Sequence, residues 1–186
     1  MKNLKVGATR ILVLATLLTC LPALSLGDSN PQSLLTAPPT LTSLEKQVRH
    51  ALVTLPYYGV FDHIEFQVQD NRVILSGQVA WPMLKDDAEN ALLPIEGVIH
   101  VTNNIKVLPL SSFDNAIRFQ EYRAIFRTSS LYRYAMGAIP SIHIIVDNGH
   151  VTLYGAVANK ADSQIAELAA NTVPGVFSVT NNLRVD

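Results

Sequence analysis

Two stretches of the chain decide its fold: residues 142–157 read IHIIVDNGHVTLYGAV, and residues 64–79 read IEFQVQDNRVILSGQV. In the first stretch, apolar residues alternate with others on both sides of Asn148-Gly149, the type of dipeptide that a type I′ hairpin turn prefers. With this dipeptide at the tip, Val146 faces Val151, and the apolar side chains share one face of the hairpin. The first stretch therefore predicts a two-stranded antiparallel hairpin.

The second stretch predicts the same hairpin with Asp70-Asn71 at its tip. This register pairs Val68 with Val73 and places apolar residues on one face. The opposite face carries polar residues, and we expect it to be solvated; they are Glu65, Gln67, Gln69, Arg72 and Ser76.

The two hairpins belong to an internal duplication. Sliding the chain by 78 residues aligns 64–108 with 142–186 without a gap, and 17 of the 45 aligned pairs are identical. Such self-similarity is the signature of a repeated structural unit. The sequence therefore predicts two copies of one fold.

A helix is expected before and after each hairpin. Thr42 and Glu45 form a capping-box pattern, Asn159 can cap the helix after the second hairpin, and Pro82 suits the first turn of its counterpart. In the second copy the leading helix is expected from Asp114 to Ser130. The predicted apolar stripes are Leu44, Val48, Leu52 and Leu55; Leu84, Ala88, Ala91 and Leu92; Phe119, Tyr122, Ile125 and Phe126; and Ile165, Leu168 and Ala169.

A last strand, 98–107 or 176–185, ends each copy. The unit is thus α-β-β-α-β and the fold class is α+β. Each unit is a small three-stranded mixed sheet with two helices on one face. The predicted domains are 42–109 and 111–186, and Gly77, Gly97, Gly155 and Gly175 are interpreted as structural glycines.

The N-terminal residues have the pattern of a secretory signal peptide. Three basic residues precede the apolar run 11–21, which is too short to span a bilayer. Ordinary cleavage would follow Gly27 and leave residues 28–41 as a flexible linker. Two alternatives are open: a lipoprotein signal at 17–20, which would place an acyl chain on Cys20, or an uncleaved anchor. We expect a periplasmic protein, or an outer-membrane lipoprotein if Cys20 is acylated.

Composition and motifs exclude several classes of function. The chain of 186 residues has a net charge of −1, and its part from residue 28 onward has a net charge of −4, so a nucleic-acid partner is not expected. Cys20 is the only cysteine, which excludes an internal disulfide. No nucleophile elbow, zinc-protease motif or phosphate-binding loop occurs, and the histidines are scattered. We therefore expect no catalytic residues, metal site or cofactor.

The repeated motifs resemble the BON domain. They read VILSGQV at 73–79 and VTLYGAV at 151–157, and the closing segments run over 97–107 and 175–185. The second copy is the better match, because the first has Asn71 where the second has Gly149. The resemblance implies a non-enzymatic envelope protein of Gram-negative bacteria that is associated with phospholipid and with resistance to osmotic or envelope stress.

One segment combines arginines with aromatic residues, from Asn115 to Ala135. The candidate lipid-binding residues are Arg118, Phe119, Arg123, Arg127, Tyr132 and Arg133. At 100° per residue, Arg123 and Arg127 lie about 40° apart on the helix, whereas Arg118 lies about 140° from Arg123. Basic and aromatic side chains suit the surface of an anionic bilayer. A protein-contact face, for which the partner would be an envelope protein, and a plain solvated helix remain alternatives.

Overall fold

The computed structural model describes residues 42–186, and the predictions for the signal peptide (1–27) and the linker (28–41) lie outside these residues. The first repeat consists of α1 (Ser43–Val53), β1 (His63–Gln69), β2 (Arg72–Val79), α2 (Pro82–Leu92), β3 (His100–Asn103) and β4 (Lys106–Val107). The second consists of α3 (Ser112–Phe126), a short 3-10 helix η1 (Tyr132–Ala135), β5 (Ile142–Asp147), β6 (His150–Val157), α4 (Lys160–Ala170) and β7 (Ser178–Val185). No helix within 42–186 is both long and apolar enough to span a bilayer.

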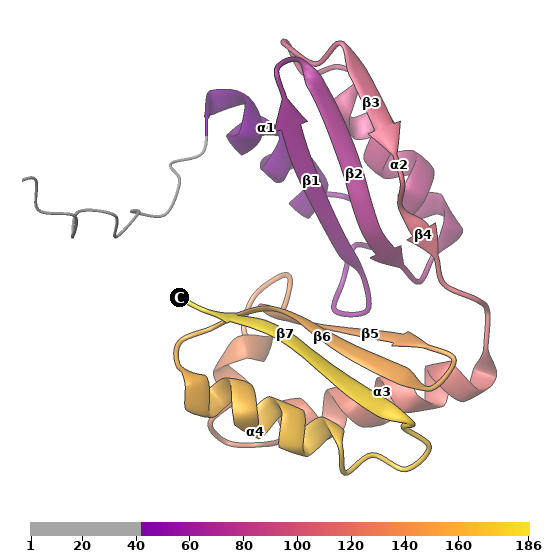
Figure 1. The fold of residues 1–186 in the computed structure, drawn as a ribbon, viewed down its shortest axis with the longest axis vertical. Coiled ribbons are helices and arrows are strands. Elements are labelled where there is room, and N and C mark those ends of the chain that lie inside the picture. The colour runs from indigo at the N-terminus through magenta and orange to yellow at the C-terminus, as the bar shows by residue number, and fades with distance from the viewer. Residues whose placement is uncertain (1–41) are drawn as a thin grey trace, which may run out of the picture. The chain divides into compact units, whose positions relative to one another are not determined.

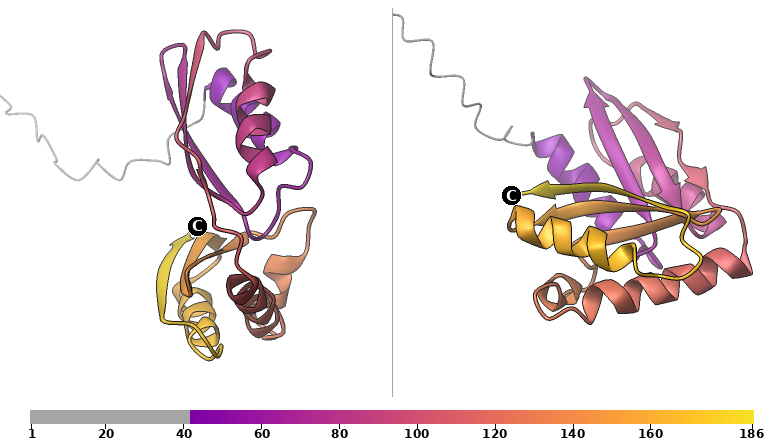
Figure 2. Two further views of the ribbon diagram at one scale, coloured as in Figure 1. Left: turned by 90° about the vertical axis from the view of Figure 1, so that its right-hand side faces the viewer. Right: turned by 60° about the horizontal axis from the view of Figure 1, so that its bottom comes forward.

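Each repeat contains one mixed sheet. β1 pairs antiparallel with β2, and β3 and β4 both pair parallel with β2. In the second repeat β5 pairs antiparallel with β6, and β7 pairs parallel with β6. The two helices of each repeat lie on one face of its sheet (Figure 1 and Figure 2). The predicted α+β fold with two α-β-β-α-β units is confirmed, although the last strand of the first repeat is divided into β3 and β4.

The hairpin registers are those that the alternation predicted. Val146 lies opposite Val151, and Val68 lies opposite Val73. Asn148 and Gly149 both have positive φ, 52° and 76°, as a type I′ turn requires. At the other tip Asp70 has a φ of 54°.

The predicted helix caps form hydrogen bonds. The amide of Glu45 donates to Thr42 Oγ1 at 3.2 Å, and the amide of Thr42 donates to Glu45 Oε2 at 2.6 Å, which completes the capping box. Asn159 Oδ1 accepts from the amide of Asp162 at 2.8 Å. Pro82 begins α2 as predicted.

The core of each repeat lies between its helices and its sheet. In the second repeat Leu153, Ile144 and Ala166 are fully buried. Leu168 was predicted to face this core, but it is 68% exposed, because the buried face of α4 runs through Ala166 and Ala170 instead. These small side chains allow α4 to approach the sheet closely.

The glycines inside β2 and β6 allow a close approach of two backbones. Gly155 has a φ of +115°, and a Cβ built on it would lie 1.9 Å from the carbonyl oxygen of Ser141. Gly77 repeats this geometry, with a φ of +113° and a distance of 2.1 Å from its Cβ to the carbonyl oxygen of His63. Only glycine fits these positions without moving the neighbouring strand. Gly97 and Gly175 also have positive φ.

The two repeats contact each other. The amide of Ile144 on β5 donates to the carbonyl oxygen of Val60 at 2.7 Å, and the ammonium group of Lys106 forms an ion pair with Asp147. The rings of His63 and Tyr154 stack with centroids 3.9 Å apart. Because β5 is an edge strand, the bond that the Ile144 amide donates to Val60 also satisfies a backbone group that would otherwise face outward.

Candidate functional site

Helix α3 carries most of the candidate residues. Ser111 caps it by accepting a hydrogen bond from the amide of Asp114 at 3.1 Å, and the helix ends at Phe126, four residues before the predicted Ser130. Its exposed residues form an outer face that contains basic and aromatic side chains but no acid. We name this set the α3 outer face: Ser112, Phe113, Asn115, Ala116, Phe119, Gln120, Tyr122, Arg123 and the C-cap Arg127.

Arg123 and Arg127 are the free charges of the α3 outer face. Both are exposed, and neither forms an ion pair or a side-chain hydrogen bond with another residue of 42–186. Phe119 is 60% exposed and its ring packs edge-on against Phe61, with centroids 5.8 Å apart. The structure therefore brings these two arginines and Phe119 together, as the helical spacing predicted.

Arg118 does not belong to this face, and the expectation that it contacts lipid is wrong. It is only 4% exposed, and its guanidinium donates to the carbonyl oxygen of Val146 at 2.8 Å and to Asn115 Oδ1 at 2.6 Å. Burial lowers the pKa of Arg118, and the nearby carboxylate of Asp114 partly offsets this effect. Arg118 thus satisfies an outward carbonyl of the edge strand β5 and is unavailable to a head group.

The two acids of α3 are both buried. Asp114 is fully buried and accepts hydrogen bonds from the amides of Asn148 and Gly149, at 3.0 and 2.8 Å, so it holds the tip of the β5–β6 hairpin. Glu121 is also fully buried, and neither of its carboxyl oxygens has a hydrogen-bond partner among the described residues. Burial raises the pKa of Glu121 to about 8, so this side chain is mostly neutral at pH 7. No carboxylate therefore offsets the two arginines on the α3 outer face.

The last two candidates, Tyr132 and Arg133, lie on η1. Tyr132 is 60% exposed. Arg133 forms an ion pair with Asp162 and donates to the hydroxyl of Tyr134 at 2.8 Å. The hydrogen bond from the Tyr134 hydroxyl lowers the pKa of Asp162 most, and the hydrogen bond and charge of Arg133 lower it further. The charge of Arg133 is therefore already paired within the second repeat.

Sequence reasoning missed two exposed aromatic positions. Tyr122 was predicted to lie in the core but is 38% exposed. Phe177 is 69% exposed, and its ring centroid lies 6.2 Å from that of Phe113 at the start of α3. Its counterpart in the first repeat, Ile99, is also exposed, at 81%, so an exposed apolar side chain at this position is common to both repeats. Within residues 42–186 no three metal-ligating side chains cluster.

The described chain is thus a tandem of two α+β units, and the second unit carries the basic and aromatic α3 outer face. A family model for the BON domain matches residues 40–109 and 134–186, so the chain belongs to the BON domain family. The resemblance seen in the repeated motifs is thereby confirmed, and BON domains are binding modules rather than catalytic ones. Helix α3 precedes the second matched segment.

Comparisons with whole proteins and structures add little to this assignment. No curated protein matches the chain. Two structures of CdsD, a structural protein of the type III secretion system of Chlamydia trachomatis, are similar to it. The first, of the C-terminal domain, is 12% identical, covers 80% of this chain and 100% of its own, and has a TM-score of 0.28. The second is 13% identical, covers 78% and 93%, and has a TM-score of 0.29.

Proposed function

We propose that this chain is a non-enzymatic envelope protein that binds anionic phospholipid at a membrane surface and supports envelope integrity or resistance to osmotic stress. The α3 outer face of the second repeat makes the contact. The observation that carries the proposal is that this face exposes Arg123, Arg127 and Phe119, while both acids of the helix are buried. Membership in the BON family supports it.

The expected binding is weak and reversible. Each basic residue near an anionic surface contributes about 1 kcal/mol, so two arginines supply about 2 kcal/mol. Partial insertion of the exposed rings of Phe119 and Tyr122 adds to this attraction, as aromatic side chains do at bilayer interfaces. Because both arginines are exposed, salt should weaken the binding over a screening length of about 8 Å at physiological ionic strength.

Reversing both charges tests the proposal. Arg123→Glu combined with Arg127→Glu should reduce binding to liposomes that contain anionic lipid by about thirtyfold or more, since about 2 kcal/mol of attraction is lost. Co-sedimentation with anionic and with neutral liposomes measures it. The matched control is Lys46→Glu with Lys160→Glu, which changes the net charge equally at exposed sites on α1 and α4 and should bind nearly as the unchanged protein does.

The same liposome measurement distinguishes lipid binding from the second candidate function, a protein-interaction or scaffold module of the periplasm. The exposed rings of Phe113 and Phe177, 6.2 Å apart, are the feature that favours it. Unchanged liposome binding in the Arg123 and Arg127 double variant, or equal binding to neutral liposomes, would contradict the lipid proposal and favour a protein partner.

We further propose that the chain is exported and trimmed after Gly27, with acylation of Cys20 as the alternative. The basic start, the apolar run and the small residues before Asp28 support this proposal. The intact mass of protein recovered from the periplasm should correspond to a chain that begins at Asp28. A diacylated or triacylated terminus at Cys20 would establish the lipoprotein form instead.

A further inference from the structure

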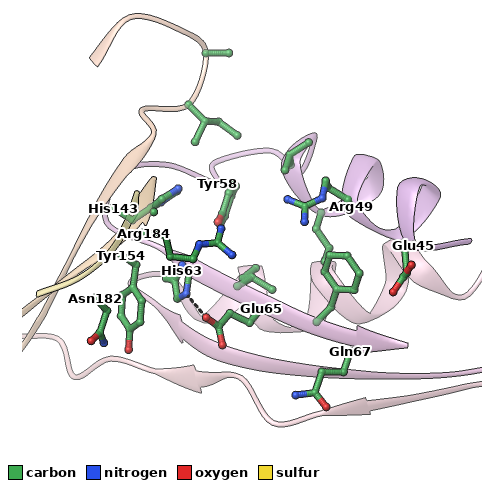
Figure 3. Close-up of a pocket in the computed structure, with 17 residues that line it drawn as sticks. Glu45, Arg49, Tyr58, His63, Glu65, Gln67, His143, Tyr154, Asn182 and Arg184 are labelled. Atoms are coloured by element: carbon green, nitrogen blue, oxygen red, sulfur yellow. Dashed lines mark hydrogen bonds and ion pairs between the residues drawn. The ribbon is translucent and has the colours of Figure 1, made fainter. Parts of the chain in front are cut away.

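A cavity of about 870 Å³ is lined by residues from both repeats. Its wall comes from α1, from β1 and the segment before it, from residues 138 and 139, and from β5, β6 and β7 of the second repeat (Figure 3). The volume falls within the range of pockets that hold small molecules. It lies apart from the α3 outer face, because none of its lining residues belongs to α3.

Much of the wall is apolar or aromatic. Leu52 and Val53 of α1 contribute side chains to it, and Val53 is 43% exposed. Phe66 of β1, Tyr58 and Tyr154 contribute aromatic rings, and Tyr154 is held in place by its stacking on His63. A hydrocarbon chain in this cavity would bury apolar surface on several sides.

Two arginines also line the cavity, Arg49 on α1 and Arg184 on β7. The guanidinium of Arg49 lies 5.7 Å from the centroid of the Phe66 ring, and Figure 3 shows both guanidinium groups directed into the cavity. Within residues 42–186 neither arginine forms an ion pair or donates a side-chain hydrogen bond. Two cations with free donors that share one cavity are suited to an anion.

The acids at the cavity are already engaged. Glu45 accepts a hydrogen bond from the amide of Thr42 at 2.6 Å in the capping box of α1. Glu65 contacts the imidazole of His63 at 3.0 Å. Neither carboxylate is bonded to Arg49 or Arg184, so both guanidinium groups keep their donors for a bound molecule.

We propose that this cavity binds an anionic amphiphile, a single hydrocarbon chain that ends in a carboxylate or a phosphate. The apolar wall takes the chain, and Arg49 and Arg184 take the head group by charge-assisted hydrogen bonds. This site is separate from the membrane contact at α3 and does not depend on it.

Titration of the purified protein with three probes tests the proposal, each kept below its micelle concentration and followed by calorimetry. Dodecanoate and dodecyl phosphate carry the two head groups, and dodecanol is the neutral control with the same chain. At least one of the anions should bind about tenfold or more tightly than dodecanol, and the tighter anion identifies the head group. Binding of dodecanol as tight as that of both anions would overturn the proposal.

Two variants test the location of the site. Arg49→Gln with Arg184→Gln should weaken binding of the anion about tenfold or more while leaving dodecanol unchanged. Val53→Trp, at a partly exposed position in the wall, should block all three probes by filling the cavity, and circular dichroism checks that both variants fold. The Arg123→Glu and Arg127→Glu variant should still bind the anion, which separates this site from the proposed membrane contact. Anion binding that neither cavity variant changes would overturn the proposal.

Discussion

Leu153→Asp should unfold the second repeat and lower its free energy of unfolding by about 5 kcal/mol or more. Leu153 is fully buried opposite Ile144, in the core between the β5–β6–β7 sheet and its helices. Truncating a buried leucine already removes about 2 to 5 kcal/mol, and the substitution also places an unpaired carboxylate in an apolar core. Urea unfolding followed by circular dichroism measures the loss.

Leu168→Asp is the matched control, because it makes the same chemical change in the same repeat. Leu168 is 68% exposed on α4, so its replacement should alter the free energy of unfolding by only about 0.5 kcal/mol. An unchanged unfolding midpoint for Leu153→Asp would show that the inward face of β6 is assigned wrongly. A loss in the Leu168 variant as large as that expected for Leu153 would show the same for α4.

The sequence predicted the parts of the fold that local chemistry determines. Asn148-Gly149 fixes the hairpin tip, and period-two alternation then fixes the register, because a slip of one residue would turn Leu153 to the opposite face. The capping box at Thr42 and the cap at Asn159 likewise act within three residues. The 78-residue repeat made the hairpin prediction in duplicate.

The environment of each charged side chain could not be predicted in this way. Arg118 was a candidate for lipid contact because it lies in the segment that combines arginines with aromatic residues, yet it donates to the carbonyl oxygen of Val146, 28 residues away. Leu168 shows the converse, since an apolar residue at plausible helical spacing lies outside the buried face of α4. Burial of a polar group depends on contacts between elements, and no local period encodes those contacts.

The cavity is the feature that the sequence predicts least. Arg49 and Arg184 are 135 positions apart in the chain, and they line the same space only because the two repeats contact each other. Arg184 lies in the repeated closing segment 175–185 and Arg49 in the leading helix of the first repeat, and neither position in the sequence indicates a shared cavity. Sequence reasoning about each repeat alone therefore had no means of finding this site, whereas the arginine pair on α3 follows from helical spacing within one element.

Glu121→Leu should stabilise the protein, and the gain should increase with pH. Glu121 is fully buried without a hydrogen-bond partner among residues 42–186, and burial raises its pKa to about 8. The full shift from the ordinary value of 4.5 is worth about 5 kcal/mol at about 1.4 kcal/mol per unit. Relaxation of the helix and entry of water reduce this figure, so we expect a gain of about 3 kcal/mol at pH 8. Urea unfolding at pH 5 and at pH 8 measures it.

The pH dependence identifies ionisation of Glu121 as the cause. Between about pH 4.5 and 8 the folded protein keeps the Glu121 proton that the unfolded chain has released, so stability falls as pH rises through this window. Glu121→Gln cannot ionise and should remove the same pH-dependent fall, whereas Glu96→Leu, at an exposed acid, should leave it unchanged. A stability profile with the same slope in the Glu121 variants as in the unchanged protein would contradict the assignment. Because Glu121 is mostly neutral at pH 7, both Glu121 variants should also bind anionic liposomes as the unchanged protein does, which separates this buried carboxyl from the membrane contact of Arg123 and Arg127.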